Sequence, residues 1–191
     1  MSKLVIGILA LQGAFNAHIN KINSLGIKNI DIILVKNKVD LRNINSIILP
    51  GGESTSIFSL LKKHNLLYEL TSKLSLPNFP ILATCAGLIL LSKFKILRIA
   101  IKRNGYGGQI QSMVKKIYLN ISTYDGHFMQ GYFIRAPIIK KIFDENIKVL
   151  AHSNGFPVLL KKNNIIASTF HPELACSDAI HRMFINLLPK D

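Results

Sequence analysis

Four short and almost unbroken apolar segments constrain the fold of this chain more than any other feature of its sequence. They are rich in Ile and Val and occupy residues 3–11, 30–35, 46–50 and 80–84. A strand buried on both faces needs apolar residues at every position, whereas a strand with one face in water alternates apolar and polar residues. These segments therefore predict central strands of a parallel sheet that helices cover on both sides.

Helix-like segments separate these strands. Residues 14–26 space their apolar side chains three to four apart and stop at Gly26, a residue type common just after a helix. Residues 54–75 begin with Ser54 and Thr55, which are candidates for a helix N-cap, and they predict one broken helix or two. The alternation of strands and helices indicates an α/β fold with an open, mostly parallel sheet.

The second half of the chain predicts further strands and a last helix. Alternating apolar and basic side chains over residues 96–103 are typical of a half-exposed strand. A terminal helix is expected over residues 177–188, with one apolar face. Strands are expected at residues 148–153, 157–161 and 165–170, the last two joined by a hairpin turn.

Composition excludes several classes of protein. Hydrophobic residues make up 49% of the 191 and charged residues 18%, which argues against extended disorder and favours one core. With no internal repeat or linker, we expect a single domain over residues 1–191. The net charge of +14 raises the alternative of a nucleic-acid partner, but the lysines are scattered and no aromatic–basic motif accompanies them, so we expect no such partner.

Cysteine usage and the N-terminus predict the compartment. Two cysteines, Cys85 and Cys176, do not suggest a disulfide scaffold, and a reducing cytoplasm is the simpler interpretation. The short apolar run after Lys3 lacks a convincing cleavage site, so we do not interpret it as a signal peptide. No apolar segment reaches the length needed to span a membrane.

Cys85 is a candidate nucleophile because of where it lies. It follows the apolar segment 80–84 and precedes a second apolar run, which places it on a strand-to-helix turn. The turn has small neighbours, Ala83, Ala86 and Gly87, as a nucleophile elbow requires. The N-terminus of the following helix would favour the thiolate. The alternative is a buried thiol that fills the core.

His171 and Glu173 supply the partners that a cysteine nucleophile needs. If the backbone is extended there, their side chains project on the same side, and Pro172 stiffens the segment between them. His171 would take the thiol proton and Glu173 would orient the imidazole. Considered alone, the triplet His171-Pro172-Glu173 could instead form an ordinary surface turn.

Gly51 and Gly52 follow the strand expected at 46–50 and let the backbone approach a substrate closely. Their N–H groups, with that of Ala86, are candidate donors to the oxyanion of a tetrahedral intermediate. An ordinary strand-to-helix turn is the alternative here.

Together these residues resemble the class I, triad-type glutamine amidotransferases, which have a flavodoxin-like fold. Within that family, the chain is similar to the glutaminase subunits of pyridoxal 5′-phosphate synthases over nearly its whole length. The matching segments are ILALQGAFNAHI (8–19), PGGEST (50–55), TCAGLILLSK (84–93), RNGYGGQ (103–109), IRAP (134–137) and FHPEL (170–174).

The resemblance implies hydrolysis of L-glutamine to glutamate and ammonia through a thioester on Cys85, with the ammonia passed to a synthase subunit. It implies no metal and no cofactor. It assigns acid–base catalysis to His171 and its orientation to Glu173. Glutamine would be surrounded by Gly51, Gly52, Glu53, Arg103, Ile134 and Arg135, and the synthase subunit would face Gln12, Phe15 and His18. A guanidinium such as that of Arg135 suits a substrate carboxylate.

The chain departs from the family pattern at Ala83 and Gly108 and has a shorter segment between residues 93 and 103. Two alternatives remain open. One is a glutaminase subunit of another amidotransferase, such as that of histidine biosynthesis, which PGGEST and the LQG opening argue against. The other is a docking subunit that binds the synthase without catalysis, which the intact triad argues against.

Overall fold

The computed structural model describes residues 3–105, 112–120 and 128–189. At its centre lies a seven-stranded sheet in the order β2-β1-β3-β4-β11-β10-β9. Strands β2 to β11 in this order run parallel, and β10 and β9 join them as antiparallel neighbours. The predicted open, mostly parallel sheet is therefore confirmed. Its strands are β1 (Leu4–Leu9), β2 (Ile30–Val35), β3 (Ser46–Leu49), β4 (Ile81–Thr84), β9 (Lys148–Ser153), β10 (Phe156–Lys162) and β11 (Ile165–Ser168).

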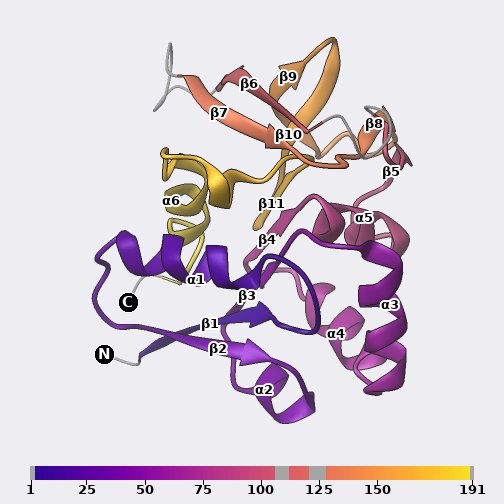
Figure 1. Cartoon of the computed structure of the whole chain (residues 1–191). Coiled ribbons are helices and arrows are strands. Elements are labelled where there is room, and N and C mark those ends of the chain that lie inside the picture. Colours follow the sequence, from indigo (N-terminus) through magenta and orange to yellow (C-terminus); the bar gives the residue numbers. More distant parts are fainter. Residues whose placement is uncertain (1–2, 106–111, 121–127, 190–191) are drawn as a thin grey trace.

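Helices cover both faces of this sheet, as predicted (Figure 1). Successive strand residues point to opposite faces: Ile47 and Leu49 enter one hydrophobic core, whereas Ile48 between them enters the other. Burial on both faces explains why β1, β3 and β4 are almost entirely apolar. The prediction of a central strand at residues 30–35 is wrong, because β2 lies at the edge of the sheet, where it is only half-buried and includes Asp31. One face carries α1 (Phe15–Ser24) and α6 (Ala179–Ile185), and the other carries α2 (Lys38–Arg42), α3 (Ser54–Lys63), α4 (Leu67–Leu74) and α5 (Ala86–Lys93).

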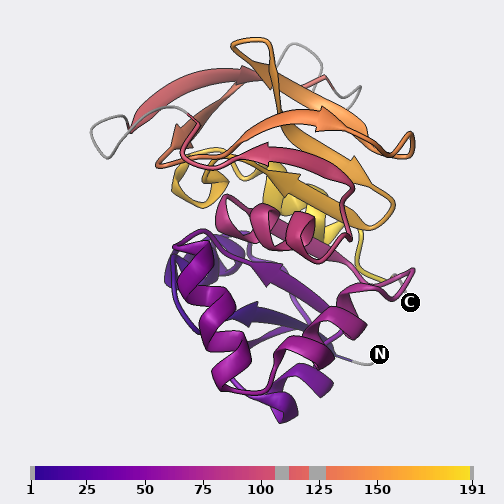
Figure 2. The same cartoon turned by 90° about the vertical axis from the view of Figure 1, so that its right-hand side faces the viewer.

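Two antiparallel ribbons lie at the β9–β10 end of the molecule (Figures 1 and 2). One pairs β5 (Ile99–Lys102) with β8 (Ile138–Ile142), and the other pairs β6 (Met113–Tyr118) with β7 (Phe128–Phe133). The apolar patterns predicted β5 but not β6, β7, β8 or the short helix α2. β6 and β7 bury one face against the α1–α6 core and expose the other, so their sequences are too mixed to predict a central strand.

The segment 54–75 forms two helices, which separate near Asn65 in a left-handed conformation with φ of 52°. The N-cap predicted at Ser54 or Thr55 is wrong, because α3 begins directly after Glu53. The Glu53 carboxylate accepts hydrogen bonds from the backbone N–H groups of the second and third helical residues. In the described part of the chain, no helix is long and apolar enough to cross a membrane.

Candidate active site

Cys85 lies on the predicted turn between β4 and α5, and its backbone is in a conformation that few residues adopt. Its φ is 47° and its ψ is −99°, and its N–H donates a 2.9 Å hydrogen bond to the carbonyl of Ser168 on β11. A non-glycine residue with positive φ and this ψ is strained and must be held by its surroundings. The elbow thus presents the thiol at the carboxyl end of the central strands, where open α/β sheets bind ligands.

Small neighbours make this turn possible. A Cβ added to Gly87 would lie 2.1 Å from the carbonyl oxygen of Leu49, so α5 packs directly against β3 there. Ala83 is fully buried in β4 and pairs regularly with Leu49 and Ala167. The alanine at this position therefore leaves the strand pairing regular.

His171 and Glu173 are in contact, with His171 Nδ1 and Glu173 Oε1 2.8 Å apart. The extended backbone predicted for this pair is wrong, because Pro172–Leu174 forms a 3₁₀ turn. Proline fits the first position of such a turn, and the tight turn brings the Glu173 carboxylate back to the imidazole. The backbone N–H of His171 is anchored by a 2.9 Å hydrogen bond to the carbonyl of Tyr132 on β7.

The electrostatics of this pair favour an imidazolium beside a carboxylate. Burial lowers the pKa of His171, but hydrogen bonds with Cys85 and Glu173 outweigh it and raise the pKa to about 10. Burial likewise raises the pKa of Glu173, but the neighbouring His18 and the hydrogen bond from His171 bring it below its ordinary value. The arrangement can therefore hold a proton on His171 next to the thiol of Cys85.

A pocket of about 260 Å³ contains Cys85 and His171. The sequence prediction missed three of its lining residues, Ser54, Ile89 and Asn104. Each lies within a segment that matches the family, PGGEST, TCAGLILLSK or RNGYGGQ, and that was the signal that could have found them. The predicted residues that line the pocket are Gln12, Gly52, Glu53, Cys85, Arg103, Ile134, Arg135 and His171.

The glycine loop packs against both the imidazole and the start of α1. A Cβ on Gly51 would lie 2.2 Å from His171 Cε1, and one on Gly52 would lie 2.7 Å from Gln12 Oε1. The Gly51 carbonyl accepts a 3.0 Å hydrogen bond from the N–H of Ala14, and Gln12 Oε1 accepts one of 2.9 Å from the N–H of Glu53. The chain just before α1 is therefore bonded to the candidate oxyanion loop.

Glu53 and Arg103 form one wall of the pocket. The Glu53 carboxylate accepts hydrogen bonds from the start of α3 and a 2.9 Å hydrogen bond from Arg103. The backbone hydrogen bonds of the cap are the main reason that the pKa of Glu53 falls to about 2. Glu53 thus stays ionised and fixes Arg103 at the pocket, while Arg135 lies exposed at the same opening.

The prediction that His18 faces a partner subunit is contradicted, because its side chain is fully buried. The start of α1 carries the amphipathic pattern that turns this position inward, and His18 contacts Glu173 and His181 instead of solvent. Phe15 is half-buried against the core, and Gln12 is half-buried and turned toward the pocket. No local pattern indicates that His18 and His181, 163 residues apart, would meet.

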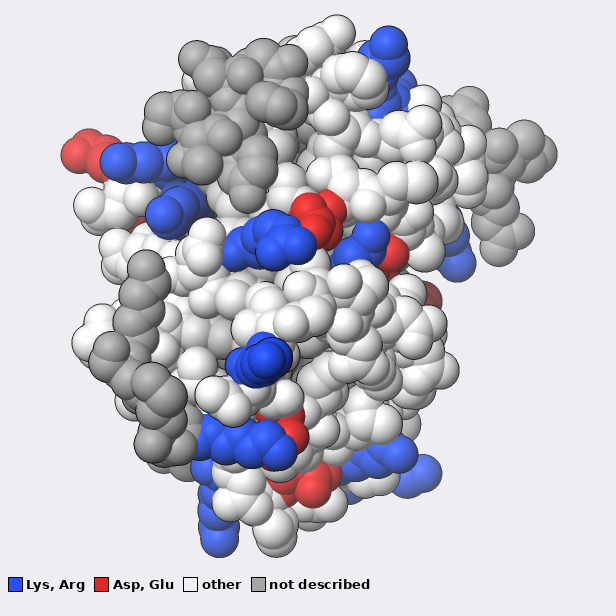
Figure 3. Space-filling view, turned by 90° about the vertical axis from the view of Figure 1, so that its left-hand side faces the viewer, with Lys and Arg blue, Asp and Glu red and all other residues white. Residues whose placement is uncertain are grey.

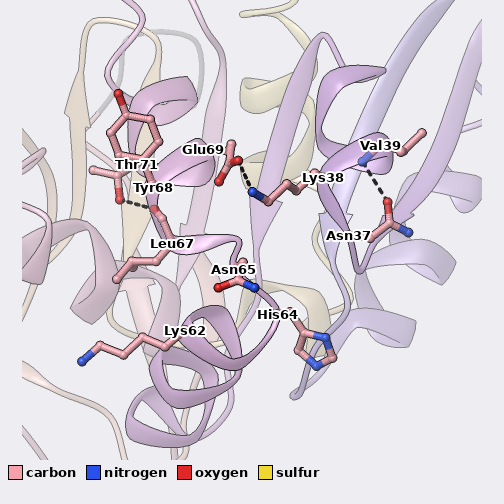
Figure 4. A pocket seen from close by; sticks show the side chains of 10 residues that line it. All are labelled: Asn37, Lys38, Val39, Lys62, His64, Asn65, Leu67, Tyr68, Glu69 and Thr71. Atoms are coloured by element: carbon pink, nitrogen blue, oxygen red, sulfur yellow. Dashed lines mark hydrogen bonds and ion pairs between the residues drawn. The ribbon is translucent and has the colours of Figure 1, made fainter.

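The structure also has a second pocket, apart from the one that contains Cys85 and His171. This wider pocket of about 1020 Å³ lies between α2, α3 and α4. Figure 4 shows the ten side chains that line it, none of which is predicted for catalysis. Both Cys85 and Cys176 are free thiols. Gly108 lies outside the described residues. Within those residues, no group of three or more His, Cys, Asp or Glu side chains is arranged to hold a metal ion.

The positive charge is spread over the surface. On the face that Figure 3 shows, lysines and arginines form separate spots, and several lie next to acidic residues. Ion pairs offset part of the charge, for example that of Arg182 with Asp178 at 2.6 Å. That face therefore lacks the continuous basic surface with which proteins bind nucleic acid.

Comparison with known proteins places this geometry in a family. The family model of the SNO glutamine amidotransferases matches residues 8–190. The pyridoxal 5′-phosphate synthase subunit PdxT of Francisella philomiragia is 38% identical over 95% of this chain and 98% of its own length. PdxT of Thermoplasma acidophilum is also 38% identical, over 96% and 92% of the two chains.

Solved structures agree. A crystal structure described as a glutamine amidotransferase superposes with a TM-score of 0.83 and 32% identity, covering 95% of this chain and 97% of that one. The structure of PurLQS from Thermotoga maritima has a TM-score of 0.68 at 14% identity, with 97% and 99% covered, and shares the fold. On these matches, the chain belongs to the SNO glutamine amidotransferase family.

Proposed function

We propose that this chain hydrolyses L-glutamine to L-glutamate and ammonia and delivers the ammonia to a synthase subunit that makes pyridoxal 5′-phosphate. The observation that carries the proposal is the strained elbow of Cys85, which shares one pocket with the His171–Glu173 pair. Membership of a glutamine amidotransferase family supports the substrate. The names of the PdxT relatives, 38% identical over nearly the whole chain, support the final product and the partner.

The reaction follows from the chemistry of these groups. The Cys85 thiolate attacks the carboxamide carbon of glutamine, and His171 holds the proton that the thiol gave up. The carbon–nitrogen bond then breaks, that proton goes to the leaving nitrogen, and ammonia departs from a γ-glutamyl thioester. Water attacks the thioester, giving a proton to His171, and glutamate leaves as the carbon–sulfur bond breaks. Glu173 keeps its hydrogen bond to His171 throughout.

The pocket also suits the rest of the substrate. Arg135 is placed to bind the α-carboxylate of glutamine, because a guanidinium donates two parallel hydrogen bonds to a carboxylate. Backbone N–H groups of Gly51, Gly52 and Ala86 are the candidate donors to the oxyanion. The hydrogen bond from Ala14 to Gly51 supports a role for the start of α1 in setting this loop.

The domain, the partner surface and the compartment belong to the same proposal. Residues 1–191 would form one glutamine amidotransferase domain, since the central sheet takes strands from both halves of the chain. Gln12 and Phe15 would lie near the synthase subunit, and the complex would work in the cytoplasm.

The test is ammonia release from glutamine by the full chain, with and without the synthase subunit encoded in the same genome. We expect release that rises when the synthase is added and disappears in Cys85→Ala. Cys176→Ser removes the other free thiol, which is exposed, and should leave the rate unchanged. No ammonia under either condition, with binding to the synthase retained, would overturn the proposal, because the chain would then serve only to dock.

A further inference from the structure

Four polar side chains lie buried behind His171 and do not line the pocket. They come from α1, the end of β4, the turn after His171, and α6. Burial of this many polar groups is costly unless they are hydrogen-bonded to one another. They are His18, Thr84 and His181, each 0% exposed, and Glu173, 6% exposed.

These side chains form a chain of contacts that ends on the second oxygen of Glu173. His181 Nε2 lies 3.0 Å from His18 Nδ1. The other nitrogen of His18, Nε2, lies 3.3 Å from Thr84 Oγ1 and 3.5 Å from Glu173 Oε2. Oε1 of the same carboxylate bonds to His171, whereas the buried Oε2 has no hydrogen-bond partner among the described residues and faces His18 Nε2.

The positions of the ring protons on His18 and His181 follow from the cost of leaving a buried N–H group without an acceptor. Burial lowers the pKa of His18 and, to about 3, that of His181, so both rings are neutral and carry one proton each. A proton on His18 Nε2 faces the Glu173 carboxylate, and Nδ1 then accepts from His181 Nε2–H. The opposite tautomer would turn a lone pair toward the carboxylate and leave the buried His181 Nδ1–H without an acceptor.

We propose that His18 is a positioning residue for the triad: its Nε2–H holds Oε2 of Glu173, so that Oε1 stays on His171. His181 supports it by fixing the tautomer of His18. Glu173 in turn fixes the tautomer of His171. The buried contacts from His181 through His18 to Glu173, here called the relay, therefore extend the triad by two side chains. The inference rests on the proposed glutaminase function for its kinetic consequence but not for its geometry.

The relay also brings α1 into contact with both halves of the catalytic machinery. Ala14, just before α1, bonds to the carbonyl of Gly51 in the candidate oxyanion loop, and His18, one turn into the helix, contacts Glu173. A displacement of this helix would therefore disturb the oxyanion loop and the triad together.

The test compares two substitutions at one position in the full chain. His18→Leu replaces the imidazole with an apolar side chain of similar size and so removes the Nε2–H donor. His18→Gln keeps an N–H donor, because the terminal amide of glutamine carries a donor and an acceptor side by side, as the imidazole edge does. Ile22→Ala is the matched control: Ile22 is buried on the same face of α1, and its truncation removes apolar packing but no hydrogen-bonding group.

The first readout is spectroscopic and does not need activity. The proton on His171 Nδ1 that bonds to Glu173 gives a downfield NMR signal, assigned by its loss in Glu173→Gln, and acidification removes it when Glu173 is protonated. The groups facing His18 are Thr84, Glu173 and His181, with His171 beyond the carboxylate and Lys21 near His181. In His18→Leu the signal should disappear at a pH about one unit higher, or be absent at neutral pH, because Glu173 has lost its donor.

The second readout is glutaminase kinetics in the complex with the synthase subunit. His18→Leu should lower kcat about tenfold with KM for glutamine unchanged, since the acid–base step loses alignment while the pocket stays intact. His18→Gln should recover most of kcat and the wild-type NMR midpoint, and Ile22→Ala should match the wild type in both.

The proposal is overturned if His18→Leu leaves the NMR midpoint and kcat unchanged, or if Ile22→Ala reproduces the changes. If His18→Leu does not fold, His18→Asn takes its place, because its shorter amide falls short of Glu173, and equal behaviour of the Asn and Gln variants overturns the proposal. Failure of the proposed function would look different: the wild-type complex would release no ammonia, while the NMR comparison would still decide the role of His18.

Discussion

Gly51 has no side chain because His171 occupies the space that one would need. A Cβ there would lie 2.2 Å from Cε1 and 2.8 Å from Nδ1 of the imidazole. We predict that Gly51→Ala pushes the ring away from Cys85 and lowers kcat/KM for glutamine about 100-fold, the cost of a displacement of roughly 1 Å. The measurement is glutaminase activity in the complex with the synthase subunit.

Gly155→Ala is the control for this substitution. Gly155 has a φ of 75°, and a Cβ there would meet nothing within 4 Å. It should cost some stability through backbone strain but leave kcat/KM unchanged. Equal loss of activity in both variants would show that general destabilisation, and not contact with His171, explains the result.

The site residues show which contacts a sequence can predict. Cys85 could be placed on its turn because small residues and a change from strand to helix mark that turn locally. The pairing of His171 with Glu173 was predicted through the wrong backbone geometry, since two residues apart in sequence can meet across a 3₁₀ turn as well as along a strand. The contact of His18 with His181 on α6 joins residues 163 positions apart, and no local pattern encodes it.

Among the elements, α3 connects stability with the pocket. Glu53 caps this helix and also pairs with Arg103. We predict that Glu53→Ala lowers the free energy of unfolding by about 1 kcal/mol, as the loss of a cap does, and raises KM for glutamine because Arg103 is released. Urea unfolding and steady-state kinetics check the two effects.

Asn37 provides a matched control on another helix. It caps α2 through hydrogen bonds to the N–H groups of Val39 and Asp40, away from the pocket. Asn37→Ala should cost a similar free energy and leave KM unchanged. A raised KM in this variant too would mean that loss of stability alone weakens glutamine binding.

Burial on one face or on two decides which elements could be predicted. Strands β1, β3 and β4 match their apolar segments within a few residues, because burial on both faces makes nearly every position apolar. β2 lies at the edge of the sheet and is only half-buried, yet its apolar segment still marks it. Strands β6, β7 and β8 pack one face each, and α2 is only five residues long, so pairing and capping decide them more than periodicity does.

For the whole molecule, the buried histidines predict how stability depends on pH. In the unfolded chain His18 and His181 have a pKa near 6.5, whereas burial lowers both pKa values in the folded protein. Below pH 6.5 these two histidines therefore bind protons in the unfolded state but not in the folded state. The free energy of unfolding should fall by up to about 1.4 kcal/mol per pH unit for each histidine.

His171 acts in the opposite direction. Its raised pKa gives stability that is complete below pH 6.5 and is lost as the pH rises toward about 10. Urea unfolding between pH 5 and pH 9 should thus show a maximum near neutrality. His181→Gln should flatten the acid side of this curve, and an acid side as steep as that of the wild type would contradict this account of the buried histidines.

The central claim is that Cys85 forms a covalent bond with glutamine, and one measurement tests it directly. The complex with the synthase subunit is mixed with glutamine, quenched in acid within the first turnovers, digested and analysed by mass spectrometry. We expect a γ-glutamyl thioester on the peptide that contains Cys85 and none on Cys176, and a different accumulated amount of the thioester in Gly51→Ala. Ammonia release without any adduct on Cys85, or an undiminished rate in Cys85→Ala, would contradict it.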